Sequence, residues 1–188
     1  PIVGSMGFLY DSSDRCTQVT DYRGNATVLG FNSSMQRTRV LDAESKVFTF
    51  TYNSESQMLT SMDPYSQSIE HQYDSSGNRT ATIDELTHPT SFTYYGDGSV
   101  QAQTSPLGQV TTLSRDSVGR ITLVQDPINL AGASSIVRSN TYHYSPIGQV
   151  DYHINGESKK TTFTYDSTWQ LESVVDPLGH GNSYASDS

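Results

Sequence analysis

Tyr73-Asp74-Ser75-Ser76-Gly77-Asn78-Arg79 is the clearest copy of a motif that recurs along the whole chain. Its first two positions, an aromatic residue and then a polar residue, return every 21 residues. We call the first position the anchor; the anchors are Tyr10, Phe31, Tyr52, Tyr73, Tyr94, Arg115, Tyr144 and Tyr165. The step from Arg115 to Tyr144 is 29 residues, so we expect an insertion at about residues 128–140. A fixed period of this length predicts a repeat architecture, with a further repeat beginning at Ser186.

A second recurring position lies eleven residues after each anchor. The residues there are Asp21, Asp42, Asp63, Asp84, Ser105, Asp126, Asn155 and Asp176, and Pro follows four of them. Asp accepts backbone hydrogen bonds, Pro presets φ and Gly takes positive φ. A turn is therefore predicted at each of the two recurring positions. The runs between them, such as residues 48–52 and 58–62, alternate apolar and polar side chains, which is typical of β-strands.

These patterns predict an all-β protein, with residues 1–188 forming a single array of antiparallel β-hairpins, one hairpin per repeat. We expect the hairpins to add side by side into one curved or spiralling sheet. If the alternation runs unbroken through each hairpin, Phe50, Tyr142 and Tyr144 share a face with residues of the following runs. Those residues include Met62, Tyr152 and Val175.

Composition excludes several classes of protein. Only 34% of the 188 residues are hydrophobic and the net charge is -9, which argues against nucleic acid or an anionic membrane as a partner. No apolar run is long enough for a membrane helix. The single cysteine, Cys16, excludes an internal disulfide and is interpreted as a buried, inert thiol. Because the chain begins at Pro1, we expect a piece of a longer protein.

The heptapeptide at 73–79, together with Arg115-Asp116-Ser117-Val118-Gly119-Arg120 and the Asp-Pro-Leu-Gly turn at 176–179, resembles the YD repeat of the Rhs family. That family includes bacterial polymorphic toxins, wall-associated proteins, toxin-complex C components and teneurins. The resemblance implies a β-sheet strip that spirals into a hollow shell, which in the toxins encloses a C-terminal effector domain. The chain departs from the pattern at Tyr95, in place of the anchor Asp, and at Arg115, in place of an anchor Tyr. No position matches the family's self-cleavage motif, so only a scaffold role carries over.

No catalytic, metal-binding or cofactor-binding set of residues emerges from the sequence. The Asp column suggests calcium, but one Asp per hairpin cannot supply the six to eight converging oxygens that this ion needs. We therefore expect these residues to cap turns. Neighbouring Tyr and His residues suggest acid–base chemistry, but strand alternation should turn His143 away from Tyr142 and Tyr144.

The aromatic residues are the candidate ligand contacts. Tyr142, Tyr144, Tyr152 and Trp169 offer flat faces on which sugars could stack, although the same rings could instead hold neighbouring hairpins together. The insertion is either a contacting loop or an enlarged hairpin. The interpretation that fits best is a non-catalytic segment of a shell, secreted or at the cell surface, whose partners are further repeats and an enclosed effector domain. The alternatives are an adhesion module for glycans or a receptor and, less favoured, a polysaccharide lyase. Open strand edges also predict self-association.

Overall fold

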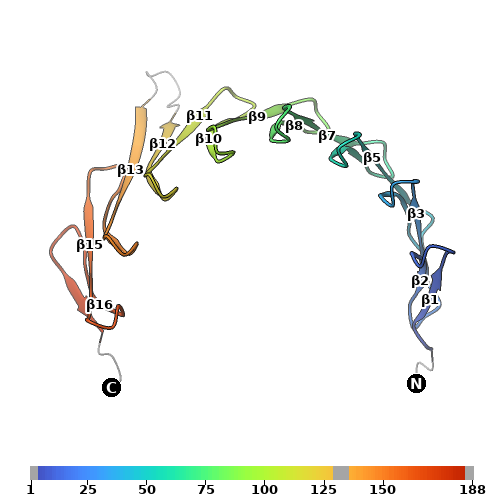
Figure 1. The fold of residues 1–188 in the computed structure, drawn as a ribbon, viewed down its shortest axis with the longest axis horizontal. Helices are drawn as coiled ribbons and strands as arrows, with labels where there is room; N and C mark the ends of the chain where they lie inside the picture. Colours follow the sequence, from blue (N-terminus) through green and yellow to red (C-terminus); the bar gives the residue numbers. More distant parts are fainter. Residues whose placement is uncertain (1–3, 129–135, 185–188) are drawn as a thin grey trace. The chain divides into compact units, whose positions relative to one another are not determined.

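A computed structural model of the chain describes residues 4–128 and 136–184. They form seventeen β-strands; within residues 7–83, and again within residues 89–183, every strand pairs antiparallel with the next one in the chain (Figure 1). The strands are β1 (Gly7–Tyr10), β2 (Cys16–Thr20), β3 (Ala26–Phe31), β4 (Arg37–Leu41), β5 (Val47–Tyr52), β6 (Met58–Met62), β7 (Ser68–Tyr73), β8 (Arg79–Ile83), β9 (Pro89–Tyr94), β10 (Val100–Thr104), β11 (Val110–Arg115), β12 (Ile121–Ile128), β13 (Ile136–Tyr144), β14 (Val150–Ile154), β15 (Lys160–Tyr165), β16 (Leu171–Val175) and β17 (Gly181–Ser183). The predicted all-β hairpin array is therefore confirmed.

The chain divides into two compact segments, residues 1–90 and 91–188. Within each segment the hairpins lie side by side in a single layer (Figure 1). Among the described residues only Ala81 is buried, so neither segment has an ordinary hydrophobic core. A lone β-sheet is usually stabilised by a second layer packed on its apolar face. The contacts between neighbouring hairpins must therefore supply much of the stability.

A β-bulge in every repeat sets which side chains share a face. The second strand of each hairpin holds one extra residue near the turn; in β14 this is Asp151, because Tyr144 pairs with Val150 and His143 with Tyr152. The same irregularity occurs in the other repeats. An extra residue interrupts the alternation, and side chains beyond it point to the opposite face.

The predicted shared face is therefore wrong beyond the bulge. Tyr152 lies opposite His143, not on the face of Tyr142 and Tyr144. Met62 lies opposite Thr49, and Val175 opposite Thr162, so both leave the aromatic face in the same way. The physical reason is that directly opposed residues share a face, and the bulge moves the pairing by one position.

Both kinds of turn have the same construction. In the turn at 74–78, the Asp74 carboxylate accepts hydrogen bonds from the backbone N–H of Ser76 and Asn78, both at 2.9 Å, and Gly77 has φ of 86°. The turn at 176–180 repeats these bonds from Asp176 to Leu178 and His180, both at 2.8 Å. The predicted role of the Asp column in turn capping is confirmed for Asp176, and Asp74 of the anchor turn caps in the same way.

The insertion lengthens one hairpin. β12 and β13 pair as far as Ile128 and Ile136, with Asp126 opposite Arg138. Asp126 and Pro127 thus lie inside a strand, so the turn predicted there is wrong. The added residues allow the strand pairing to continue beyond Pro127. The rest of the insertion, and the anchor expected at Ser186, lie outside the described residues. Throughout 4–128 and 136–184, no helix is long and apolar enough to cross a membrane.

Candidate functional site

Four anchor tyrosines connect their hairpins to the one before. The Tyr52 hydroxyl donates a hydrogen bond to the Arg37 carbonyl oxygen at 2.9 Å, and the Tyr73 hydroxyl donates to that of Met58 at 2.9 Å. Both acceptors are the first residue of the second strand in the preceding repeat. The second segment repeats the contact, from Tyr144 to Ile121 at 2.8 Å and from Tyr165 to Val150 at 3.1 Å. We call these bonds the tyrosine ladder.

A parallel set of contacts follows the edge that carries the anchor turns. It comes from the residue five positions after the anchor, which is long and polar in most repeats. Gln57 and Gln149 donate from Nε2 to the carbonyl oxygens of Gly77 at 2.9 Å and Trp169 at 2.8 Å, each in the next anchor turn. This column was not recognised in the sequence, although its recurrence could have shown it.

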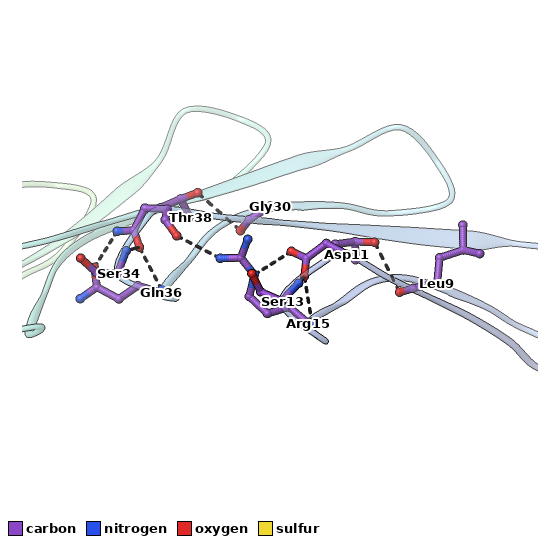
Figure 2. A network of polar contacts seen from close by, with 10 residues as sticks. Leu9, Asp11, Ser13, Arg15, Gly30, Ser34, Gln36 and Thr38 are labelled. Atoms are coloured by element: carbon purple, nitrogen blue, oxygen red, sulfur yellow. Dashed lines mark hydrogen bonds and ion pairs between the residues drawn. The ribbon is translucent and has the colours of Figure 1, made fainter.

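Two arginines in the same column make an ion pair and a contact with an aromatic ring. Arg15 bonds the Asp11 carboxylate at 2.7 Å, reaches the Asn32 carbonyl oxygen at 3.1 Å and lies 5.3 Å from the centre of the Phe31 ring. Figure 2 shows Asp11, Ser13 and Arg15 together in one turn, with Ser34 and Gln36 of the next turn beside them. Arg120 is placed in the same way, 2.6 Å from the Asp116 carboxylate and 4.6 Å from the Tyr144 ring centre.

The departures from the motif compensate for each other. Arg115 occupies an anchor position and bonds the Gly119 carbonyl oxygen at 2.9 Å within its own turn. The neighbouring repeat supplies the missing bond, because the Tyr95 hydroxyl donates to the Leu113 carbonyl oxygen at 2.7 Å. Tyr95 stands where other repeats have a capping Asp, Asn or Ser, and the nearby Asp97 accepts the backbone N–H of Ser99 at 2.8 Å.

The four candidate ligand contacts do not form one site. Tyr142 stacks on His153, with ring centres 4.8 Å apart, on one face of β13 and β14. Tyr152 stacks on His143 at 4.7 Å on the other face. Tyr144 belongs to the tyrosine ladder. Trp169 occupies the left-handed position of an anchor turn, with φ of 67°, and is exposed at the sheet edge.

The histidine arrangement follows the predicted alternation. His143 lies on the face opposite Tyr142 and Tyr144, and its Nδ1 is 3.0 Å from a carboxylate oxygen of Asp151. The His143 side chain is exposed and that of Asp151 is partly exposed, and the Tyr152 ring lies parallel to the imidazole within 4°. Within the described part of the chain, no group of three or more His, Cys, Asp or Glu side chains is placed to hold a metal ion. Cys16 is only partly buried, so the full burial predicted for it is wrong.

Turn capping also affects the ionisation of the aspartates. The side-chain amide of Asn78 and backbone N–H groups in the turn hold the pKa of Asp74 below its ordinary value. Backbone and side-chain hydrogen bonds from His180 lower the pKa of Asp176 in the same way. The carboxylate form is the one that accepts these hydrogen bonds, so the turns are strongest when the aspartates are charged.

Comparison with known proteins supports the same architecture. No family model and no curated protein sequence matches the chain. Solved structures do match: the crystal structures of TcdB2-TccC3-TEV and TcdB2-TccC3-Cdc42 and a structure of a Photorhabdus luminescens Tc holotoxin pore, each with a TM-score of 0.52 and 14% identity. The chain resembles YD-repeat proteins in its fold. The matches cover 94% to 96% of this chain but 12% of each matched chain, so it spans about one eighth of their length.

Proposed function

We propose that this chain is a non-catalytic structural segment of the wall of a larger repeat protein, of the kind that encloses an effector domain. The single observation that carries the proposal is the tyrosine ladder. Its bonds join successive hairpins through backbone carbonyl groups, which every residue type has, so the contact can repeat without a matching side chain in the partner. A layer held together along its own length needs no core and suits a wall.

The character of the surface supports the same role. Almost every described strand residue is partly exposed, and threonine and serine alternate with the aromatic residues. Such a wall can enclose an unfolded or inhibited polypeptide without driving it to collapse onto an apolar surface. On this proposal the partners are further repeats and the enclosed domain, and the protein is secreted or displayed at the cell surface.

Limited proteolysis of the full-length protein that contains this chain would test the proposal. We expect the domain enclosed by the repeats to resist trypsin and to become sensitive when Tyr52, Tyr73, Tyr144 and Tyr165 are all replaced by Phe. Tyr22→Phe is the matched control, because Tyr22 is an exposed turn residue whose hydroxyl makes no hydrogen bond with any described residue. Equal cleavage rates in the wild type and the fourfold variant, with no segment protected in either, would refute enclosure.

A further inference from the structure

A β-bulge in β4 separates two neighbouring arginines. Arg37 pairs with the anchor Phe31. Arg39 pairs with Gly30, so Thr38 is the extra residue. Directly opposed residues share a face, and consecutive residues of a strand point to opposite faces. Arg37 therefore lies on the face that carries the anchors, which we call the aromatic face, whereas Arg39 lies on the other face.

Arg37 is exposed and stacks on an aromatic ring of the next repeat. Its Cζ atom lies 5.4 Å from the centre of the Phe50 ring, and the guanidinium makes no hydrogen bond or ion pair with any described residue. A guanidinium stacked on a ring keeps its N–H donors available in its own plane, where two parallel bonds to a carboxylate can form. The Phe50 ring thus positions Arg37 and leaves it able to bind an anionic group.

Arginine is concentrated on the aromatic face. Arg15 and Arg120 lie over the rings of the anchors Phe31 and Tyr144, at 5.3 Å and 4.6 Å from the ring centres. Arg79 pairs with the anchor Tyr73 and occupies the same place in its repeat as Arg37. Six of the eight arginines of the chain lie on this face: Arg15, Arg37, Arg79, Arg115, Arg120 and Arg138.

Carboxylates are placed elsewhere in the first segment. Among its described strand residues Glu70 is the only acidic one, and it lies one position before His71, on the face opposite the anchors. The other carboxylates of this segment lie in turns at the sheet edges, where those of Asp11, Asp21 and Asp74 accept backbone N–H groups. The strands therefore give the aromatic face of this segment a positive charge, although the net charge of the chain is -9.

An apolar recess adjoins the arginine stack on the same face. It has a volume of about 310 Å³, and its lining includes Phe48, Phe50 and Ile69. Phe50 is shared between the recess and the contact with Arg37. A ligand whose carboxylate reaches Arg37 can therefore place an adjacent apolar side chain against Phe50, which removes apolar surface of both partners from water.

The sheet edges disfavour a continuous polyanion. The recess also borders Asp63 and Glu85, and the capping carboxylates of Asp11 and Asp74 lie in the anchor turns. A DNA duplex carries one phosphate charge per about 1.7 Å of its axis, so it would bring phosphates against these carboxylates. A polypeptide can instead carry single carboxylates separated by apolar residues, which matches an isolated arginine beside an apolar recess.

We propose that the aromatic face of the first segment binds an acidic polypeptide segment, with Arg37 as the central contact. A carboxylate of the ligand would accept hydrogen bonds from the Arg37 guanidinium, while a neighbouring apolar side chain fills the recess lined by Phe48, Phe50 and Ile69. This interaction goes beyond the proposed wall function and does not depend on it, because a single layer of hairpins presents the same face whether or not it encloses a domain.

Titration calorimetry of the chain with a capped peptide of repeating Glu-Gly-Leu-Ser units tests this inference. We expect saturable binding with a Kd on the order of 1 mM or lower, and binding about fivefold weaker for a matched peptide with Gln in place of Glu. Added NaCl should weaken binding of the Glu peptide, because salt screens exposed charges. Arg37→Gln should weaken it about fivefold, and Phe50→Leu, which removes the ring beneath the guanidinium, should also weaken it.

Arg39→Gln is the matched control, because it removes the same charge from the same strand on the opposite face, and both arginines are exposed. Arg37→Gln keeps the backbone carbonyl that accepts the Tyr52 hydroxyl, so the tyrosine ladder remains; far-UV circular dichroism verifies the fold. The inference is overturned if the Glu peptide gives no saturable binding, if the Gln peptide binds equally tightly or if a DNA duplex binds more tightly. It is also overturned if Arg39→Gln weakens binding as much as Arg37→Gln.

Discussion

Removal of one hydroxyl group from the tyrosine ladder should loosen the contact between two hairpins by a measurable amount. Tyr144 donates to the Ile121 carbonyl oxygen at 2.8 Å in a partly buried position. Tyr144→Phe deletes this bond and keeps the ring on which the Arg120 guanidinium packs. A hydrogen bond of this kind contributes about 1 kcal/mol, which corresponds to roughly a fivefold change in an equilibrium constant.

A larger truncation should cost more, and by a predictable increment. Tyr144→Leu removes the hydroxyl and also the cation–π contact with Arg120, which contributes a further amount of about 0.5–1 kcal/mol at a partly exposed site. The combined loss of about 1.5–2 kcal/mol corresponds to an increase of roughly ten- to thirtyfold in local opening. The difference between the Phe and Leu variants therefore measures the arginine contact separately from the hydrogen bond.

Native-state hydrogen exchange is the suitable assay, because repeat arrays need not unfold as one cooperative unit. Amides of β12 and β13 should lose about fivefold in protection in Tyr144→Phe, while amides of β3 and β4 stay unchanged. Tyr10→Phe provides the control, with an expected change within about 0.5 kcal/mol, since Tyr10 is exposed and its hydroxyl has no acceptor among the described residues. Equal changes in both variants would show that the ladder does not join the hairpins.

Four further predictions concern turns, pH and the sheet edge. Thr87 has φ of 66°, which is costly for a β-branched residue, so Thr87→Gly should stabilise by about 0.5–1 kcal/mol in thermal unfolding, whereas Gly119→Ala should destabilise. Lower stability of Thr87→Gly would contradict this account. Folding lowers the pKa of Asp74, so its carboxylate contributes stability above the unfolded-state pKa near 3.8, and this contribution is lost as the pH falls through the folded value. In Asp74→Asn, the free energy of unfolding from urea denaturation should therefore fall less at acidic pH. An unchanged pH dependence would argue against capping by the charged form. Desolvation, with a smaller contribution from Arg79, lowers the pKa of His71, so the fold should also lose stability as the pH falls from 6.5 towards that lowered value, a loss absent in His71→Gln. The exposed edge strand β1 should give concentration-dependent association in sedimentation velocity, reduced by Leu9→Lys; a single monomer at all concentrations would exclude it.

The local sequence determined the repeated hairpins and their turns. The pair Tyr73-Asp74 marks a turn wherever it recurs, because the capping bonds of Asp74 and the positive φ of Gly77 are formed within five residues. The alternation along each strand could likewise be read from neighbouring residues. Such short-range rules need no knowledge of the rest of the fold, which is why the all-β hairpin array was predicted correctly.

Only the tertiary structure decided which strand residues share a face and what the anchor tyrosines do. The extra residue Asp151 in β14 is not visible as a bulge in the sequence, yet it places Tyr152 and Tyr142 on opposite faces. The bond from Tyr144 to Ile121 spans 23 residues, and the pairing of Asp126 with Arg138 turns a predicted turn into a strand. Each of these features depends on how two distant strands align, and that alignment is set by the pairing of whole hairpins, which no single stretch of residues encodes.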